Sequence, residues 1–396
     1  MKKLLTVLLV VSMLMGLAIL PASAEGIAKD ELKIGVIHIL EPGDQGYTYN
    51  HHMGCLKALE NLGLAESQYI PKFNIDETDT AAATAALNEL IDAGCQIIFG
   101  TSFSYGTTMV EVAKEHPEVV FCHATGSDAH FAGLDNLHNY FARIHEARYL
   151  AGIVAGLNTK NNKLGYVTAF PFAEVISGYT AFYLGAKSVN PDVTMDVMYA
   201  NTWGDPTIES QVAQALCDRG CDVISQHSDS TAPATTAEKN GVLHVGYNND
   251  MIAAAPAASL ISARIDWSKY MTYAIGCMLN GETIVMDWSD GLAQEAVYLS
   301  PLNTTIAAEG TQEAVDAAAA KIIAGELDIF KGPFTAVGGA PATVVEYGAT
   351  EPMFTFDTDA VFEESTVEGT QGADGFVSGF SAPLFNAILE GVTEVQ

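Results

Sequence analysis

Basic residues are scarce in this sequence of 396 residues, and they disappear altogether towards its C-terminal end. Lys and Arg number 18 against 48 Asp and Glu, which leaves a formal net charge of −30, and no Lys or Arg follows Lys331. A surface with this excess of negative charge repels nucleic acid and anionic lipid. We therefore expect no nucleic-acid partner, and we expect residues 340–396 to form an acidic C-terminal extension.

The sequence also lacks the short motifs that mark common catalytic sites. It contains no G-x-S-x-G elbow, no H-E-x-x-H pair and no Walker loop. The adjacent residues His51 and His52 would point about 100° apart on a helix, which makes them a poor metal chelate. We therefore predict a protein that is not an enzyme and has no catalytic residue, metal or cofactor.

Cysteine spacing adds no metal site. Of the six cysteines, only Cys217 and Cys221 are close in sequence, and no second pair or histidine spacing completes a zinc ligand set. An exported chain can form disulfides. Most of these cysteines, however, lie inside apolar patterns, where a small buried thiol is the simpler interpretation.

Long apolar runs are absent beyond the N-terminus. Lys2 and Lys3 precede an apolar run over 4–20, and an A-x-A pattern ends at Ala24. This order is typical of a cleavable signal peptide, here residues 1–24, and the run is short for a membrane anchor. No cysteine follows the run to carry a lipid, so we expect an exported periplasmic or extracellular protein without a lipobox.

Short apolar runs alternate with amphipathic stretches along most of the chain. Strand–helix–strand alternation is typical of parallel sheets with right-handed crossovers. The alternation runs twice, with a pause near residues 138–147, so the pattern predicts two doubly wound α/β lobes. The predicted strands are 33–39, 69–73, 96–100, 118–123, 163–168, 194–199, 221–226 and 242–247.

The ends of these predicted strands carry aromatic and short polar side chains and almost no Lys or Arg. In open α/β sheets, ligands bind beyond the carboxyl ends of the strands. Aromatic rings there can sandwich a flat ligand, and Thr, Asn or Asp can hydrogen-bond its edge. A phosphate or carboxylate ligand would favour Arg, Lys or a Gly-rich loop. Each aromatic alone could equally cover the core, so the inference depends on several of them meeting at one edge.

Several segments follow one another in the order of a known family pattern. They are Asp44-Gln45-Gly46-Tyr47-Thr48, His116-Pro117-Glu118-Val119-Val120-Phe121, Tyr149-Leu150-Ala151-Gly152-Ile153, Asn162-Lys163-Leu164-Gly165-Tyr166-Val167, Phe182-Tyr183-x-Gly185-Ala186, Asn190-Pro191-Asp192-Val193, Tyr199-x-x-x-Trp203-x-Asp205 and Ile329-Phe330-Lys331-Gly332-Pro333. On these segments, over roughly residues 31–335, the chain resembles the basic membrane protein family, the substrate-binding proteins of ABC importers for purine nucleosides and related compounds.

The resemblance implies a type I periplasmic-binding fold, in which two Rossmann-like lobes are joined by three crossovers and close on a ligand. It implies a first lobe of residues 25–142 plus 249–288 and a second lobe of residues 143–248 plus 289–339. It also implies an ABC permease as partner. We expect the binding protein itself to be a monomer.

Departures from the family pattern concern the ligand. In nucleoside-binding members two aromatic side chains sandwich the base, and Tyr47 and Trp203 stand at these positions. The Asp that reads the purine edge is replaced by Thr125, which can both donate and accept. The Asn, Asp and Lys that hold the ribose become Thr48, Asn248 and Ile265, and an Ile cannot donate a hydrogen bond.

These departures favour a free purine nucleobase, adenine first, over a nucleoside. The alternatives are a purine nucleoside, another flat heterocycle, or a ligand-sensing receptor module without transport. His123, Asp205 and Asp250 are further candidates, and Asp44 is expected to shape the turn that presents Tyr47. The predicted ligand-binding residues are Asp44, Tyr47, Thr48, His123, Thr125, Trp203, Asp205, Asn248 and Asp250.

Overall fold

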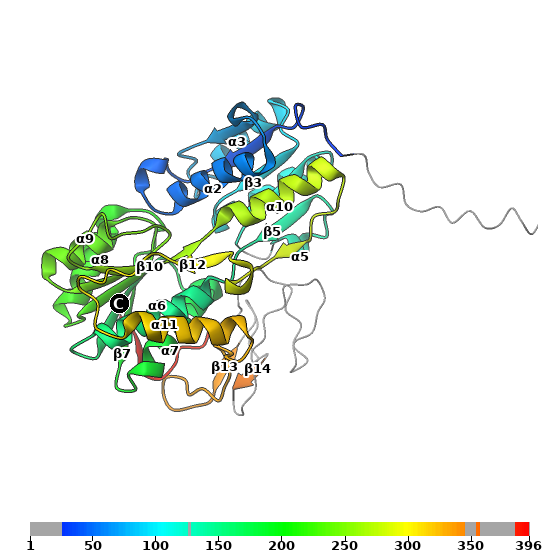
Figure 1. Ribbon diagram of the computed structural model, residues 1–396. Helices are drawn as coiled ribbons and strands as arrows, with labels where there is room; N and C mark the ends of the chain where they lie inside the picture. The colour runs from blue at the N-terminus through cyan, green and yellow to red at the C-terminus, as the bar shows by residue number, and fades with distance from the viewer. Residues whose placement is uncertain (1–25, 126–127, 345–353, 357–384, 396) are drawn as a thin grey trace, which may run out of the picture.

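The computed structural model describes residues 26–125, 128–344, 354–356 and 385–395. These residues form two α/β lobes, one built from the blue and cyan segments of Figure 1 and the other largely from the green segments. The predicted signal peptide and most of the predicted acidic extension lie outside the described residues. Within the described part of the chain, no helix has the length and apolar character needed to cross a membrane.

The first lobe contains a six-stranded sheet in the order β2-β1-β3-β4-β5-β11, with every neighbouring pair parallel. The central strands are buried on both faces, as expected for a parallel sheet covered by helices. The strands are β1 (Ile34–Ile37), β2 (Tyr69–Lys72), β3 (Ile97–Gly100), β4 (Val120–Ala124), β5 (Leu137–Tyr140) and β11 (Asp287–Trp288).

Helices flank this sheet and pack in pairs, α2 with α10 and α3 with α4. Figure 1 shows α2 and α10 side by side along one face of the first lobe. The helices of this lobe are α2 (Tyr47–Leu62), α3 (Thr80–Asp92), α4 (Gly106–Glu115), α5 (Asp128–Ala132) and α10 (Trp267–Asn280), with short 3-10 turns η1 (Pro42–Asp44), η2 (Glu66–Gln68) and η3 (Phe103–Tyr105).

The second lobe contains a seven-stranded sheet in the order β12-β10-β9-β8-β6-β7-β15. All neighbours are parallel except β12, which runs antiparallel to β10. The strands are β6 (Lys163–Thr168), β7 (Thr194–Tyr199), β8 (Val223–His227), β9 (Leu243–Tyr247), β10 (Ser259–Ile265), β12 (Val297–Leu299) and β15 (Val392–Val395). The helices are α6 (Ile144–Asn158), α7 (Ala173–Val189), α8 (Pro206–Asp218), α9 (Ala232–Asn240) and α11 (Thr311–Ile323), and η4 (Leu292–Gln294) precedes β12.

Both sheets wind in the same way. In the first, the chain begins at β1, moves out to β2 and then crosses back to β3; in the second, it follows the same course through β6, β7 and β8. The strand order therefore reverses between β1 and β3 and between β6 and β8. Ligands of doubly wound sheets bind at the carboxyl ends of the strands beside such a reversal.

The chain passes between the lobes three times, as predicted. It crosses after β5 through residues 141–143, after β10 at residues 265–267, and between β11 and β12 through residues 289–296. The second crossing lies later than expected, because residues 259–265 pair with β9 in the second sheet, whereas the prediction had the first lobe resume at residue 249. The chain returns to the first lobe with α10, which packs against α2.

The end of the chain is more ordered than predicted for an acidic extension. Residues of β13 (Ala342–Val344) and β14 (Phe354–Phe356) form an antiparallel pair, and β15 adds to the second sheet along β7. Phe385, Leu389 and Val392 are buried. This apolar surface anchors the last residues to the second lobe in spite of the local excess of acidic residues.

All six cysteines are unpaired thiols, five of them buried and Cys217 half-buried. Burial raises the pKa of the Cys55, Cys122 and Cys221 thiols to about 12 in each case. Thiols with such pKa values stay protonated at neutral pH and are poor nucleophiles and poor metal ligands. Their structural role is to fill space in the core.

Candidate ligand-binding site

A cavity lies between the lobes, at the carboxyl ends of the strands beside both reversals of strand order. The lining residues are Ile39, Tyr47, Ser102, Phe103 and Thr125 from the first lobe and Glu174, Trp203, His227, Asp229 and Tyr247 from the second.

The turn before α2 presents Tyr47 to this cavity. The Asp44 carboxylate accepts hydrogen bonds from the main-chain N–H groups of Gly46, Thr48 and Tyr49 at 2.8–3.0 Å. These bonds satisfy donors in the first turn of the helix, which otherwise lack intrahelical partners. Asp44 itself does not line the cavity. Its role is to fix the start of α2, which carries Tyr47.

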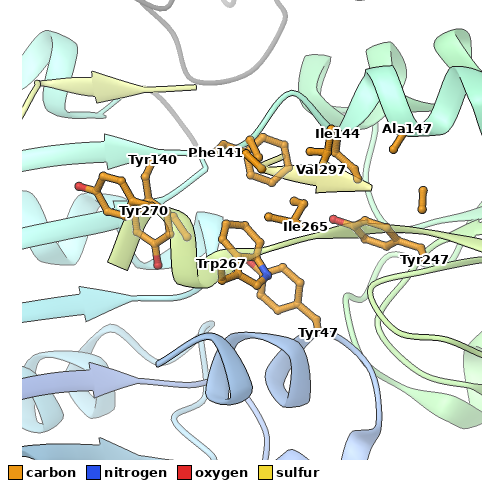
Figure 2. Packing of buried hydrophobic residues seen from close by; sticks show 14 of the residues in the cluster. Tyr47, Tyr140, Phe141, Ile144, Ala147, Tyr247, Ile265, Trp267, Tyr270 and Val297 are labelled. Carbon is orange, nitrogen blue, oxygen red and sulfur yellow. The ribbon is translucent and has the colours of Figure 1, made fainter. Parts of the chain in front are cut away.

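Aromatic side chains pack around Tyr47, and Figure 2 shows Trp267 beside it. Its ring packs edge-on against Trp267 with a centroid distance of 6.0 Å and lies 4.5 Å from the His51 ring. His51 in turn stacks on Trp267 at 3.8 Å. Because Trp267 begins α10, directly after the second crossing between the lobes, the ring of Tyr47 is held next to that crossing.

Trp203 reaches the same cavity from the second lobe, on the loop that follows β7. Its ring packs edge-on against Phe170 at 5.4 Å, and its carbonyl oxygen accepts the main-chain N–H of Asp229 at 2.9 Å. Asp205 lies two residues further along and caps α8, accepting from the N–H groups of Thr207 and Ile208. Asp205 does not line the cavity; it terminates the loop that carries Trp203.

The two lobes touch at the rim of the cavity, so the structure describes a closed arrangement. Phe103 of the first lobe stacks on Phe172 of the second with ring centroids 4.8 Å apart. The Asn249 side chain donates a hydrogen bond to the Gln45 carbonyl oxygen at 3.0 Å. A closed cleft excludes water and strengthens the polar contacts inside it.

Thr125 lines the cavity from the end of β4. Its main chain has a φ of 65°, which is uncommon for a threonine and places it in the left-handed region. The main-chain N–H donates to Tyr140, and the Asn139 side chain donates to the Thr125 carbonyl oxygen at 3.0 Å. The buried hydroxyl has no hydrogen-bond partner among the described residues, so it is available to a ligand.

Thr48 and Asn248 are fully buried beside the cavity but do not line it. The side-chain amide of Asn248 donates to the Asp229 carboxyl at 3.3 Å, and its carbonyl oxygen in the main chain accepts from Arg264 at 3.2 Å. Asn248 therefore contacts Asp229, which lines the cavity, and is not itself part of the lining.

His123 and Asp250 have main-chain partners. The His123 imidazole donates from Nε2 to the Ser102 carbonyl oxygen at 2.8 Å, and its Nδ1 lies 3.3 Å from the Asp128 carboxylate. The Asp250 carboxylate accepts the N–H of Ile252 at 3.0 Å. Neither residue lines the cavity.

Several cavity residues were not among the predicted site residues. Ser102, Phe103, His227 and Asp229 all follow or end a strand, so the strand-end rule pointed to them. Tyr247 ends β9, so the same rule covers it, whereas Glu174 in the first turn of α7 carried no such signal. The residues outside the prediction are Ile39, Ser102, Phe103, Glu174, His227, Asp229 and Tyr247.

The shifted pKa values around the cavity favour the neutral forms of Asp229 and His227. Burial, with the nearby carboxyl of Glu209, raises the pKa of Asp229 well above its ordinary value. Burial also lowers the pKa of His227 well below its ordinary value, with the Arg148 guanidinium adding to the effect. No Lys or Arg is among the lining residues. In the described residues, no three His, Cys, Asp or Glu side chains group so as to hold a metal ion.

Two doubly wound lobes with three crossings, closing over one cavity, define a type I periplasmic-binding fold. Two solved solute-binding proteins of ABC transporters share this fold. The one from Aeropyrum pernix K1 has a TM-score of 0.63 at 18% identity, covering 74% of this chain and 92% of that chain. The one from Conexibacter woesei has a TM-score of 0.57 at 18% identity, covering 75% of this chain and 97% of that chain.

The chain belongs to the Bmp family, described as "ABC transporter substrate-binding protein PnrA-like", whose model matches residues 32–330. The resemblance inferred from the sequence is thereby confirmed. A purine-binding protein of Brucella abortus is 35% identical over 313 residues, covering 79% of this chain and 87% of the relative. A putative glucose-binding protein of an ABC transporter in Haloferax volcanii is 33% identical over 296 residues, covering 75% of this chain and 73% of the relative.

Proposed function

We propose that this substrate-binding protein captures a free purine nucleobase, with adenine favoured, and delivers it to an ABC permease. The observation that carries the proposal is the pair Tyr47 and Trp203, which line one cavity from opposite lobes. Stacking on an aromatic ring suits any base and contributes about 1–3 kcal/mol per base. The relative named as a purine-binding protein supports the same ligand class.

One departure from the family pattern also supports a base rather than a nucleoside. The position that would carry the ribose-binding Lys of the family is Ile265, which is fully buried in β10 and is not among the lining residues. An aliphatic side chain offers no donor to a ribose hydroxyl.

In this proposal the predicted site residues have two kinds of role. Tyr47 and Trp203 stack on the ring, Thr125 hydrogen-bonds its edge, and Asn248 acts through Asp229. Thr48, Asp44, His123, Asp205 and Asp250 position the segments that carry these groups, through the main-chain hydrogen bonds described above. The protein performs no chemistry on the ligand, is exported to the periplasm or cell exterior, and works as a monomer.

A sugar is the second candidate, because the Haloferax relative is named as a putative glucose-binding protein. A sugar offers many hydroxyl groups and needs several hydrogen-bonding partners around its rim. The lining contains four aromatic rings besides the His227 imidazole, namely those of Tyr47, Phe103, Trp203 and Tyr247. That composition favours a flat heterocycle, and glucose therefore serves as the comparison ligand.

Thermal unfolding of the mature protein, stripped of ligand, tests the proposal. The panel is adenine, hypoxanthine, guanine, adenosine, inosine, guanosine and glucose. A ligand at about 100 times its dissociation constant adds about 2.7 kcal/mol to the free energy of unfolding. We expect a rise in melting temperature with adenine and none with adenosine or glucose. A rise with nucleosides would contradict the free-base assignment, and a rise with glucose alone would contradict purine binding.

A further inference from the structure

Asp229 places a carboxyl group inside the cavity from the second lobe. It lies two residues beyond the end of β8, it lines the cavity, and only 3% of its surface is exposed. Its position in the chain matches none of the family's base-reading or ribose-holding positions identified above. A buried carboxyl facing a ligand cavity has a strong effect on which ligand edge can bind, because an unmatched polar group there is costly.

The main chain of Asp229 is clamped between the lobes. Its N–H donates to the Trp203 carbonyl oxygen at 2.9 Å, which ties it to the aromatic loop. Its own carbonyl oxygen lies so close to Gly46 that a Cβ atom added there would stand 1.6 Å away. Closure therefore presses Asp229 against the start of α2, beside Tyr47, and leaves its carboxyl little freedom to move away from the ligand.

Among the residues that the structure describes, no positive charge forms an ion pair with this carboxyl. Its one described hydrogen bond comes from the Asn248 amide at 3.3 Å, and it forms no described ion pair with Lys or Arg. Arg148, the buried cation of this lobe, lies instead over the Tyr247 ring at 3.9 Å and donates to the Gln226 carbonyl oxygen. An ionised carboxylate in such surroundings would lack compensation for its lost hydration.

The charged and titratable groups around Asp229 are mostly acids. They are Glu209 on α8, Asp44 in η1, Glu77 between β2 and α3 and Glu174 on α7, which lines the same cavity, together with Tyr47 on α2, Tyr247 on β9 and His227. Burial raises the pKa of Asp229 well above its ordinary value, and the carboxyls of Glu209, Asp44 and Glu77 raise it further. Burial likewise raises the pKa of Glu209 to about 7.

We propose that Asp229 determines ligand specificity and binds as a neutral carboxylic acid, with its O–H donating to a ligand acceptor and its C=O accepting from an adjacent ligand N–H. The proposal rests on the proposed function, since it assumes a heterocyclic base in this cavity. Such a pair of bonds selects an edge with one donor beside one acceptor. The exocyclic amine and the neighbouring ring nitrogen of adenine form such an edge. An ionised carboxylate would instead select an edge with two donors.

The experiment measures the affinity of the tightest purine of the panel by calorimetry between pH 6 and 8.5. For the wild-type protein we expect affinity to fall as pH rises, by up to about tenfold per unit once Asp229 titrates in the unliganded protein. Binding at the alkaline end should also take up a proton, which calorimetry in buffers of different ionisation enthalpy measures without any variant. The ligand's own titration is measured in the same buffers.

Two variants distinguish the titration of Asp229 from that of the nearby Glu209. Asp229→Asn keeps one donor and one acceptor, so we expect it to retain affinity within about tenfold of wild type at pH 6 and to lose the pH dependence. Glu209→Gln is the matched control, since Glu209 titrates nearby but does not line the cavity. We expect this control to keep the fall in affinity with rising pH. Thermal melts confirm that both variants fold.

The outcomes distinguish this inference from the proposed function. Absence of wild-type binding to every purine would contradict both. Wild-type binding that is flat or strengthens with pH, with no proton uptake and a loss of about 100-fold or more in Asp229→Asn, would show an ionised acceptor and overturn the inference alone. Unchanged affinity and an unchanged pH profile in Asp229→Asn would show that the carboxyl does not touch the ligand.

Discussion

Some polar side chains near the cleft form hydrogen bonds with the main chain, and others face the cavity. The carboxylates of Asp44, Asp205 and Asp250 each accept main-chain N–H groups close by in sequence. A short acidic side chain before a helix favours this local bond, because it satisfies donors that the helix leaves free. Thr125 and Asp229, in contrast, line the cavity itself. The residue type alone does not distinguish these two uses.

Trp203 is the residue whose loss is expected to weaken binding most directly. The indole is 7% exposed in the closed arrangement and lines the cavity opposite Tyr47. Losing one base–aromatic stack of about 1–3 kcal/mol corresponds to a loss in affinity of about 5- to 150-fold in Trp203→Ala. Calorimetric titration with adenine measures it. Trp203→Phe, which keeps a ring, should lose less, and equal affinity of Trp203→Ala and wild type would remove Trp203 from the site.

Individual elements show where local pattern and tertiary pairing disagree. The run over 259–265 is an ordinary apolar strand by composition, and only its backbone pairing with β9 assigns it to the second lobe. The last residues of the chain belong to an acidic, Gly-rich stretch, yet 392–395 pair in parallel with β7 at the edge of the second sheet. An edge strand leaves donors and acceptors free for such an addition.

Strand β15 is expected to contribute to the stability of the second lobe. Val392 on this strand is 3% exposed and packs into the core, whereas its neighbour Thr393 is exposed. Removing two buried methyl groups in Val392→Ala should lower the free energy of unfolding by about 2 kcal/mol. Urea unfolding followed by circular dichroism measures this loss. Thr393→Ala serves as control, with an expected change of at most about 0.5 kcal/mol, and equal effects of the two substitutions would argue against the pairing of β15 with β7.

The whole molecule carries an unusual number of buried histidines, which link stability to pH. Burial lowers the pKa of His38, His145 and His244 to about 3. Unfolding exposes these side chains, whose ordinary pKa is about 6.5, so the unfolded chain binds more protons below that pH. Their contribution to stability is complete above pH 6.5 and is lost progressively as the pH falls towards 3.

The effect of Glu209 on the pH dependence of stability is opposite to that of the histidines. Its pKa is raised to about 7, so its contribution to the free energy of unfolding is present below its ordinary pKa of about 4.5 and is lost as the pH rises through 7. The raised pKa of Asp229 acts in the same sense as that of Glu209, whereas the lowered pKa values of His51, His138 and His227 add to the effect of the three histidines. Because the buried histidines outnumber the two carboxyls, we expect the free energy of unfolding of the ligand-free protein to fall between pH 6.5 and pH 5. Urea unfolding at the two pH values measures the change.

His244→Gln checks the assignment of this pH dependence. His244 is fully buried and bonds to Ser259 and Gln226, so the variant is less stable at every pH. Its dependence on pH should nevertheless be weaker than that of wild type, because one linked proton is removed. An undiminished slope would mean that His244 does not contribute to acid sensitivity.

The sequence by itself determined the class of protein. Apolar runs that alternate with amphipathic stretches predict parallel α/β lobes, and strand ends rich in aromatic and polar side chains predict a ligand cleft there. These features are local, since each depends on residues within one strand or one turn. Tyr47, Thr125 and Trp203 follow strands in this way, and all three line the cavity.

Only the tertiary structure decided which other side chains share that cavity and where the lobes divide. The position of Asp229 depends on its bond to the Trp203 loop and on the approach of Gly46 from the other lobe. The membership of β10 and β15 in the second sheet depends on pairing between distant segments. Such contacts join residues far apart in the chain, and their geometry follows from the packing of whole lobes, which no local pattern encodes.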